Sequence, residues 1–415
     1  MKSMSKLLEG LKVVDLTHVL AGPYSSYQLG LLGAEVIRIE NPVASDLPRI
    51  IDPDPTRQRA GMGAGFLTSN ANKSSVAIDI TVPAGADLAR TLIADADVVV
   101  ENFRPGVLKK YGLDAERLTA DHPRLIYCSI SGFGQESSWK DRPAYDDIIQ
   151  AMSGLMAITG TQESGPVMTG FPIIDYITGL MAAFAISAAV VKQQRTGQGE
   201  VIDVAMLDAA MSIMGPVFAL QHIANTPIAL RGNQSFSGSP FSGAYETSEG
   251  TLVLTANTPE QAKKLLIALQ LEDLWANPKV QNWRANPDAS ELVASRVSAV
   301  FKTKTAEDWE RLLNAASVPA SKLRSMPETL NLPYMQERGF LHRVTVPALA
   351  DEYPLPGVGF LAGGQNGYVE SPPPALGEHT IEVLKAHGIS PEQIAELSSA
   401  GVIGAHQTSN RAATQ

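Results

Sequence analysis

Short runs rich in β-branched residues alternate with longer helical patterns over the first 205 residues of this 415-residue chain. Consecutive strands separated by helices pair in parallel through right-handed crossovers. This order is typical of a doubly wound, Rossmann-like α/β fold, in which ligands usually bind beyond the carboxyl ends of the strands. The predicted strands are Val13–Leu16, Val36–Glu40, Val76–Ile80, Val98–Val100 and Leu125–Ile130, and two of the predicted helices are Tyr24–Leu32 and Ala84–Asp95.

A different pattern begins after about Leu230. Tyr245–Thr247 and Thr251–Ala256 flank a Ser-Glu-Gly turn and predict a hairpin. Residues 345–376 carry much Pro and Gly and predict a long excursion, too extended to bury itself in one compact subunit. The expected organisation is a large α/β domain made of residues 1–205 and 331–415, a linker helix over 206–229 and a smaller α+β domain over 230–330.

The composition excludes several classes of function. Lys and Arg number 33 against 43 Asp and Glu, a net charge of −10, and no window clusters the basic residues that a nucleic-acid partner needs. Hydrophobic residues make up 44% and charged residues 18%, so we expect most of the chain to be folded. The sequence also lacks a GxxxxGK[ST] phosphate loop and a GxSxG nucleophile elbow.

The chain has the character of a protein from a reducing compartment. Its single cysteine, Cys128, has no internal disulfide partner, and its histidines are scattered without ligand spacing, so we expect no metal site. Glu9 and Lys12 interrupt the apolar start, which argues against a signal peptide. The longest apolar run, Ile177–Val191, is shorter than the roughly 20 residues that span a membrane and predicts a buried helix. We therefore expect a cytoplasmic protein without a membrane partner.

One aspartate, Asp175, lies between an apolar run and the start of an Ala-rich helical pattern. Such a carboxylate caps the helix by accepting N–H groups of the first turn. Alternatively it is a nucleophile, which the helix-end donors and the positive end of the dipole would keep ionised. Position alone favours the cap.

A second polar segment, Glu101–Gly106, follows the predicted strand Val98–Val100 and opens a helix that ends near Lys109 and Lys110. Backbone N–H groups and Arg104 would there be able to face a phosphate. A capped helix with a solvated arginine explains the same residues equally well.

The order of several short motifs resembles that of one known family, the type III CoA-transferases, which include the formyl-CoA:oxalate and carnitine CoA-transferases. The resemblance covers nearly the whole chain, and the order and spacing of the motifs are more specific than any one of them. The motifs are Leu8–Thr17, Ala21–Pro23, Leu32–Pro42, Asn72–Ser74, Glu101–Gly106, Ser131–Gly134, Thr196–Gly199, Ser317–Ala320 and Pro374–Thr380.

This resemblance implies that Asp175 is the family's nucleophile. In such enzymes the carboxylate attacks an acyl-CoA thioester to give a mixed anhydride, and the released CoA thiolate then forms an aspartyl-CoA thioester. The acceptor carboxylate attacks that thioester, and CoA opens the second anhydride. Coenzyme A and acyl-CoA are thus substrates, and no permanently bound cofactor is expected. An interlocked homodimer is also implied.

A set of CoA contacts is implied in the same way. Arg104 and Lys110 would supply positive charge for the phosphates on a chain that is acidic overall. The implied CoA-binding residues are Leu20, Ala21, Ile78, Asp79, Ile80, Thr81, Asn102, Phe103, Arg104, Lys110, Arg142 and Tyr145.

Two departures from the family pattern bear on the substrate. Oxalate-directed members have a glutamine where this chain has Leu20, and a run of glycines where it has Gln234–Pro240. Leu20 lacks the amide that would hydrogen-bond a small dicarboxylate, so we expect an acceptor acid larger or less polar than oxalate. The expected donor resembles succinyl-CoA. Arg231 is a candidate for its second carboxylate, although a surface role fits that arginine equally well.

Two alternatives to a transferase stay open. The α-methylacyl-CoA racemases are similar in fold and carry an aspartate at the position of Asp175, but they have a histidine where this chain has Tyr145. A tyrosine with a pKa of about 10 is a poor base at neutral pH, and no histidine lies between His122 and His222. The second alternative is a non-catalytic CoA-binding protein.

Overall fold

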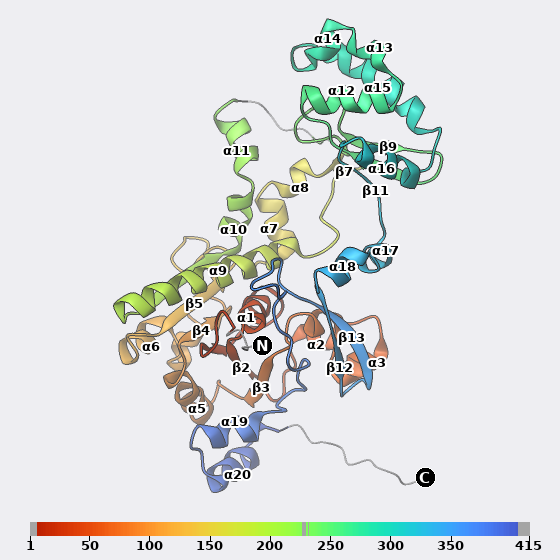
Figure 1. Cartoon of the computed structure of the whole chain (residues 1–415). Helices are drawn as coiled ribbons and strands as arrows, with labels where there is room; N and C mark the ends of the chain where they lie inside the picture. The colour runs from red at the N-terminus through yellow and green to blue at the C-terminus, as the bar shows by residue number, and fades with distance from the viewer. Residues whose placement is uncertain (1–5, 226–229, 231, 406–415) are drawn as a thin grey trace. The chain divides into compact units, whose positions relative to one another are not determined.

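The computed structural model describes residues 6–225, 230 and 232–405 of the chain (Figure 1). The chain forms two compact units. The large unit consists of Met1–Ser153, Thr169–Ala219 and Pro333–Gln415, and the small unit of Gly154–Met168 and Leu220–Leu332. Both units are therefore built from separated stretches of the sequence.

A seven-stranded sheet forms the centre of the large unit. Its strands are β1 (Lys12–Asp15), β2 (Glu35–Glu40), β3 (Lys73–Ile78), β4 (Val98–Glu101), β5 (Ile126–Ser131), β8 (Glu200–Ala205) and β14 (Ile403–Gly404). The order is β14-β3-β2-β1-β4-β5-β8, and all neighbours pair in parallel except β14, which is antiparallel to β3. Apart from β14 this is the order of doubly wound sheets, in which the direction of winding reverses between β1 and β4.

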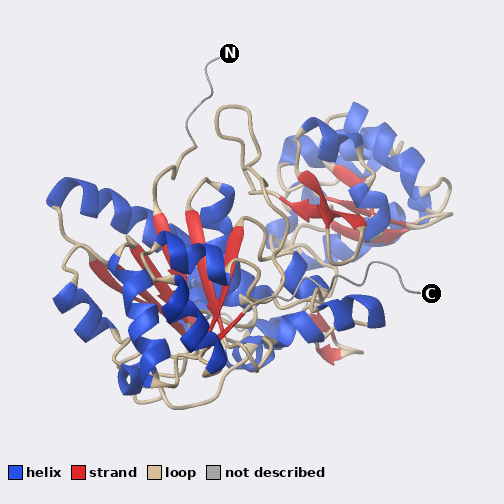
Figure 2. Cartoon of the chain, turned by 90° about the horizontal axis from the view of Figure 1, so that it is seen from below, coloured by secondary structure: helices blue, strands red, loops and turns tan. Residues whose placement is uncertain are grey.

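Helices cover both faces of this sheet, as Figure 2 shows. Side chains alternate between the faces along each strand. Val13 of β1 packs with helices α1 (Ala21–Leu31) and α9 (Ile173–Thr196), whereas Val14 packs with the helices of the opposite face. Those helices are α5 (Pro83–Ala94), α6 (Ala115–Asp121), α19 (Thr380–Ala386) and α20 (Pro391–Ser399). The prediction of an α/β fold built on a parallel sheet is confirmed.

The sequence predicts one linker helix over residues 206–229, and the structure shows a break instead. Helix α10 (Met206–Ile213) ends just before Gly215, and a separate helix, α11 (Gly215–His222), follows. Proline has no N–H to donate, and its ring clashes with the carbonyl four residues earlier, so a helix does not run unbroken through Pro216. Residues 226–229 lie outside the described part of the chain.

The segment predicted as an extended excursion packs partly on the large unit itself. Strands β12 (Leu341–Val346) and β13 (Asp351–Pro356) form an antiparallel hairpin. Val346 and Leu355 are buried with Tyr27 of α1, whose hydroxyl donates to the Pro356 carbonyl at 2.7 Å. The expectation that this segment does not bury itself is wrong for the hairpin, because alternate residues of its strands supply an apolar face.

The small unit has a three-stranded antiparallel sheet of order β11-β10-β9, formed by β9 (Gly243–Glu246), β10 (Thr251–Leu254) and β11 (Ala320–Lys322). Strands β9 and β10 confirm the predicted hairpin. The core of the unit contains Phe241, Trp283, Phe301 and Trp309. Its other elements are α8 (Leu155–Ile158), β6 (Gly160–Thr161), β7 (Gly165–Pro166), α12 (Pro259–Ala268), α13 (Glu272–Trp275), α14 (Pro278–Gln281), the 3₁₀ helix η2 (Trp283–Ala285), α15 (Pro287–Phe301), α16 (Ala306–Ala315) and α17 (Met326–Leu330).

The remaining helices of the large unit are short. They are α2 (Leu47–Ile50), α3 (Pro55–Ala60), α4 (Ala64–Leu67), the 3₁₀ helix η1 (Leu108–Tyr111), α7 (Asp146–Met152) and α18 (Pro333–Glu337).

Helix α9 contains the long apolar run of the sequence. It is the one helix among the described residues that is long and apolar enough to cross a membrane, with 44% of its apolar window buried. The core helix of a globular protein meets the same criterion. Ala182, Ala183 and Ile186 pack into the core beside the sheet, whereas Leu180 and Phe184 are exposed, so the prediction of a buried helix is correct for one face of the run only.

Candidate active site

Two loops meet at the carboxyl ends of β1 and β4, where the winding of the sheet reverses. The loop after β1 contains His18, and the loop after β4 contains Asn102. The Asn102 side chain binds the backbone of His18 twice: Oδ1 accepts the His18 N–H at 2.9 Å, and Nδ2 donates to the His18 carbonyl at 2.7 Å. Open α/β sheets usually bind ligands at such a switch point.

A cavity of about 190 Å³ lies at this point. The loops after β1, β4 and β5 contribute to its wall, together with the start of α9. Some of the residues in this wall were not expected from the sequence, among them His18, Val19, Lys140 and Met206. The residues singled out by the sequence that line it are Leu20, Ala21, Asn102, Phe103, Arg104, Arg142, Tyr145 and Asp175.

The other predicted CoA contacts do not line this cavity. Ile78 at the end of β3 is 1% exposed and offers a ligand no side-chain surface, and Ile80 packs against the same core. Asp79 accepts hydrogen bonds from the N–H and the hydroxyl of Thr81 ahead of α5. Lys110 is exposed at the end of η1. Contacts of these residues with CoA stay a prediction.

Asp175 is the third residue of α9 and does not cap it. The N–H groups of Ile174 and Asp175 donate to Oδ2 of Asp146 at 2.6 and 3.0 Å. Gln150 holds Asp146 in place, because its side-chain amide donates to Oδ1 and accepts the Thr169 N–H at 3.0 Å. The interpretation of Asp175 as an N-cap is therefore wrong, and Asp146 of α7 fills that role.

The Asp175 carboxylate borders the cavity, and no hydrogen bond or ion pair to it is found in the described part of the chain. Burial raises the pKa of Asp175 to about 7, and the charges of Asp146 and Asp147 add to the increase. The sequence argument expects the helix N–H groups to keep this carboxylate ionised. The N–H groups of Ile174 and Asp175 instead donate to the Asp146 carboxylate, so they do not stabilise the ionised form of Asp175, and its pKa rises. Perturbed groups of this kind cluster at functional sites.

Close packing of α1 and α9 sets the distance between Asp175 and the wall formed by Leu20 and Ala21. Gly179 lies about one turn after Asp175, on the same side of α9. A Cβ at Gly179 would lie 2.6 Å from the Ala21 carbonyl oxygen and 3.1 Å from Cδ1 of Tyr24. The absence of a side chain at Gly179 is what allows the two helices to approach this closely.

Three cations, Arg104, Lys140 and Arg142, line the cavity. None of them forms an ion pair within the residues that the structure describes. The Arg142 guanidinium lies 4.0 Å from the ring centre of Trp139, which packs edge to face against the buried Phe133. The three side chains are thus available to phosphate or carboxylate groups of a ligand.

Reasoning from the sequence missed His18, Lys140 and Asp146. His18 stands two residues after the predicted strand Val13–Leu16, so the rule that ligands bind beyond the carboxyl ends of strands would have found it. Asp146 acts on N–H groups 28 and 29 residues further along the chain, a contact without a local signature. Lys140 stands in a polar loop and carries no signal.

Two further candidates of the sequence lie elsewhere. Gln234–Pro240 belongs to the small unit, and Arg231 lies outside the described residues. Within the described ranges, no group of three or more His, Cys, Asp or Glu side chains is arranged to hold a metal ion.

Comparison with known proteins gives consistent matches over most of the chain. A sequence profile described as CoA-transferase family III matches residues 8–380. The succinyl-CoA:glutarate CoA-transferase of Homo sapiens is 33% identical over 404 residues, which cover 97% of this chain and 91% of the human protein. The succinate–glutarate CoA-transferase of Agrobacterium fabrum is 34% identical over 389 residues, covering 91% and 94%.

Solved structures with folds similar to that of this chain agree with the sequence matches. A CAIB/BAIF family protein from Brucella suis has a TM-score of 0.77 at 29% identity, covering 92% of this chain and 100% of the other. The protein Rv3272 from Mycobacterium tuberculosis has a TM-score of 0.79 at 28% identity, covering 92% and 99%.

Proposed function

The chain belongs to CoA-transferase family III and is a CoA-transferase, and we propose that Asp175 is the nucleophile of its reaction. The observation that carries the proposal is a carboxylate without a protein partner among the described residues, bordering a cavity that three cations also line. Ion pairs or hydrogen bonds to the charged form would lower the basicity of a nucleophilic carboxylate, and the Asp175 carboxylate has neither with the residues that the structure describes.

The proposed reaction exchanges groups at the side-chain carbon of Asp175. The ionised carboxylate attacks the donor thioester, the C–S bond breaks, and CoA leaves as a thiolate from a mixed anhydride. The thiolate attacks the Asp175 side of the anhydride and releases the donor acid, which leaves an aspartyl-CoA thioester. The acceptor carboxylate displaces the thiolate from Asp175, and the thiolate then attacks the acceptor carbonyl. This last step forms the new acyl-CoA and frees Asp175.

The ionisation of Asp175 supports this role. A pKa of about 7 leaves roughly half of the group ionised at neutral pH. Its ionised form is more basic, and therefore more nucleophilic, than an ordinary aspartate.

We propose succinyl-CoA as the donor and a five-carbon dicarboxylic acid such as glutarate as the acceptor. The relative from Homo sapiens is named a succinyl-CoA:glutarate CoA-transferase, and the relative from Agrobacterium fabrum a succinate–glutarate CoA-transferase. Leu20 gives the cavity an apolar wall, which suits the methylene chain of such acids better than oxalate, which has none. Arg104, Lys140 and Arg142 supply positive charge for the CoA phosphates and for a free carboxylate.

An interlocked homodimer, as the family resemblance implies, is part of the proposal. Its support is a set of large apolar side chains exposed on the large unit: Leu180, Phe184 and Val191 of α9 and Val201 of β8. Exposed apolar side chains gathered on one part of a surface are typical of interfaces. Light scattering should give twice the mass of the chain, and the mass of a single chain would refute this part.

Trapping of the covalent intermediate tests the role of Asp175. The enzyme is incubated with succinyl-CoA without acceptor, treated with hydroxylamine and digested for mass spectrometry. We expect a hydroxamate at Asp175, none in Asp175→Ala, and the wild-type yield in Asp208→Asn, which changes an exposed carboxylate of α10 outside the cavity. An adduct at another residue, or full transfer activity in Asp175→Ala, would refute the role.

A screen of acids tests the substrates. Initial rates with succinyl-CoA are compared for oxalate, succinate, glutarate and longer dicarboxylic acids. Glutarate should react faster than oxalate, and the reverse order would contradict the interpretation of Leu20.

One observation bears on the racemase alternative. The cavity contains a histidine, His18, whose pKa burial lowers, so its imidazole is neutral and able to act as a base. Incubation with a 2-methylacyl-CoA in deuterated water separates the two reactions. Rapid exchange of the α-hydrogen without any acceptor acid would replace the transferase proposal by a racemase.

A further inference from the structure

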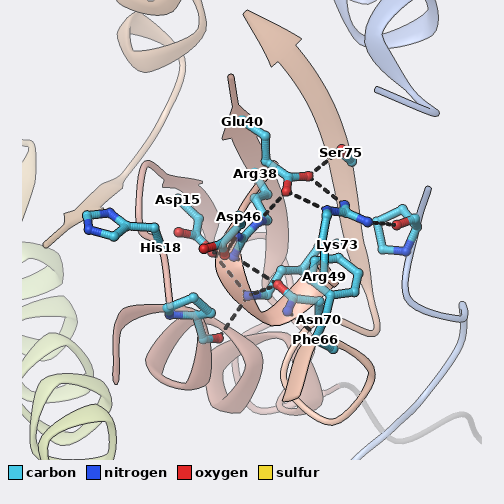
Figure 3. Close-up of polar contacts among 12 residues, drawn as sticks. Asp15, His18, Arg38, Glu40, Asp46, Arg49, Phe66, Asn70, Lys73 and Ser75 are labelled. Carbon is cyan, nitrogen blue, oxygen red and sulfur yellow. Dashed lines mark hydrogen bonds and ion pairs between the residues drawn. The ribbon is translucent and has the colours of Figure 1, made fainter. Parts of the chain in front are cut away.

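Six charged side chains form a buried cluster in the large unit (Figure 3). Their side-chain exposures lie between 0% and 9%. Three are acids and three are bases, so the cluster is neutral as a whole. The members of this buried charge cluster are Asp15, Arg38, Glu40, Asp46, Arg49 and Lys73.

Arg38 lies at the centre of the cluster. Its Nη2 is 2.6 Å from Oδ2 of Asp46, and its Nε is 3.3 Å from Oε1 of Glu40. Arg49 donates to both oxygens of Glu40 at 2.8 and 2.7 Å, and its guanidinium lies 3.6 Å from the ring centre of Phe66. Charges are tolerated in an interior only when they are paired in this way.

Two contacts tie the cluster to the beginning of α1. Lys73 donates from Nζ to the Pro23 carbonyl at 2.8 Å, and Asp15 accepts the hydroxyl of Ser26 at 2.6 Å. Pro23 and Ser26 stand in the first two turns of the helix that begins with Ala21. The cluster therefore fixes this end of α1 against the sheet.

A third contact reaches the loop ahead of α1. Val19 donates its N–H to Oδ1 of Asp46 at 3.0 Å, while Oδ2 of the same carboxylate binds Arg38. The φ angle of Val19 is +64°, in the left-handed region that β-branched residues avoid. On the other side of Val19, Asn102 holds both backbone groups of His18.

These contacts lie beside Leu20 and Ala21, which line the cavity together with His18, Val19 and Asp175. We propose that Asp46 is a positioning residue, which holds Val19 in its left-handed conformation and so places the wall of Leu20 and Ala21 for the reaction at Asp175. The proposal rests on the proposed function of Asp175.

Stability alone gives a weaker reason for the cluster. Replacement of buried ion pairs by apolar residues of similar size is often neutral or stabilising. Apolar side chains at these positions would pack, but they would offer no acceptor for the Val19 N–H. The contact with Val19 is what connects the cluster to the cavity.

A double-mutant cycle between Asp46 and Val19 tests the proposal. Asp46→Ala removes the acceptor of the Val19 N–H, so we expect kcat with succinyl-CoA and glutarate to fall about tenfold, with less than about a threefold change in KM for succinyl-CoA. Glycine adopts the left-handed conformation without steric cost. In a Val19→Gly background, Asp46→Ala should therefore lower kcat less than about threefold.

Two further variants separate positioning from loss of fold. Asp46→Asn keeps an oxygen acceptor and should retain most of kcat, while its Tm falls because Arg38 loses a charged partner. Glu310 of the small unit makes contacts of the same kind, since it binds Arg324 at 2.8 Å and accepts the Lys322 N–H at 3.2 Å. Glu310→Ala should lower Tm and leave kcat near the wild-type value.

Hydrogen exchange in the absence of substrate gives a readout that does not depend on activity. The backbone amides of residues 17–24 should exchange faster in Asp46→Ala than in the wild type, because the Val19 N–H is released. Unchanged exchange, or an equal loss of kcat in both Val19 backgrounds, would overturn the positioning role of Asp46. Failure of the wild type to form an Asp175 adduct would instead refute the proposed function, and the exchange result would still decide whether Asp46 holds this loop.

Discussion

Gly179→Ala tests whether the spacing of α1 and α9 controls the chemistry at Asp175. The added methyl carbon would lie 2.6 Å from the Ala21 carbonyl oxygen, whereas ordinary contacts of a Cβ begin at 3.4 Å. The two helices must therefore separate by about 0.8 Å at this point, the difference between those distances. Because a displacement of about 1 Å at a reacting group costs about 100-fold in rate, we expect kcat to fall about 30- to 100-fold.

The same substitution changes stability less than activity. Overpacking costs about 1–3 kcal/mol, and alanine recovers about 1 kcal/mol of helix propensity relative to glycine. The free energy of unfolding should therefore fall by no more than about 2 kcal/mol, which leaves the enzyme folded. Urea unfolding and steady-state kinetics on the same samples check both numbers.

Gly215→Ala is the matched control for this experiment. Gly215 is the first residue of α11, and a Cβ there would have no atom of the described residues within 4 Å. This variant should keep the kcat and the stability of the wild type. A Gly179→Ala enzyme that retains kcat within about threefold would show that the approach of α1 and α9 does not control the reaction.

Four further predictions concern the charges of the site. Because the ionised form of Asp175 reacts, kcat/KM for succinyl-CoA should rise with pH with an apparent pKa of about 7. Asp146→Asn should move the midpoint of this pH profile to lower pH, because the substitution removes a neighbouring negative charge. The raised pKa of Asp175 destabilises the folded state increasingly as the pH rises from 3.8 to about 7. In urea unfolding, Asp175→Asn should therefore be more stable than the wild type, by up to about 4 kcal/mol at pH 8 and by less at pH 5. Equal stability of the variant and the wild type at both pH values would contradict the burial of a charged group. Arg142→Gln should raise KM for succinyl-CoA about tenfold with a smaller change in kcat, since a cation that holds phosphate binds ground and transition states alike.

The centre of the large unit's sheet was predictable because residues 98–100 of β4 are apolar on both faces. Val98, Val99 and Val100 form an unbroken run of β-branched residues, a pattern that by itself predicts a central strand of a parallel sheet. All three are fully buried in the structure. The break between α10 and α11 was also readable at Pro216. The sequence still predicted a single helix, because the apolar residues on either side of Pro216 continue the helical pattern.

The charged residues of β2 show where local patterns mislead. Arg38 and Glu40 alternate with Ile37 and Ile39, which reads as a strand with one face in solvent, yet both charged side chains are buried. Their partners come from separate parts of the sequence, such as Lys73 of β3, and only the fold brings them together. Burial of a charge depends on such partners and has no signature in its own segment.

The candidate site divides in the same way. Residues that directly follow predicted strands, such as Asn102 and Arg104, were found from position and from the family resemblance. Asp146 was missed because it acts on the N-terminus of another helix. The state of Asp175 could not be predicted from its sequence neighbours, because its pKa depends on burial and on the side chain that takes the helix N–H groups.

The path of one oxygen atom tests the central claim most directly. In the proposed reaction the acceptor carboxylate attacks the Asp175 thioester, and the oxygen that bridges the anhydride stays on Asp175 when CoA leaves with the acceptor. A single turnover of succinyl-CoA with glutarate labelled with ¹⁸O in its carboxylates should therefore place one labelled oxygen on Asp175, as mass spectrometry of the peptide detects. Formation of glutaryl-CoA without label on Asp175 would contradict the account.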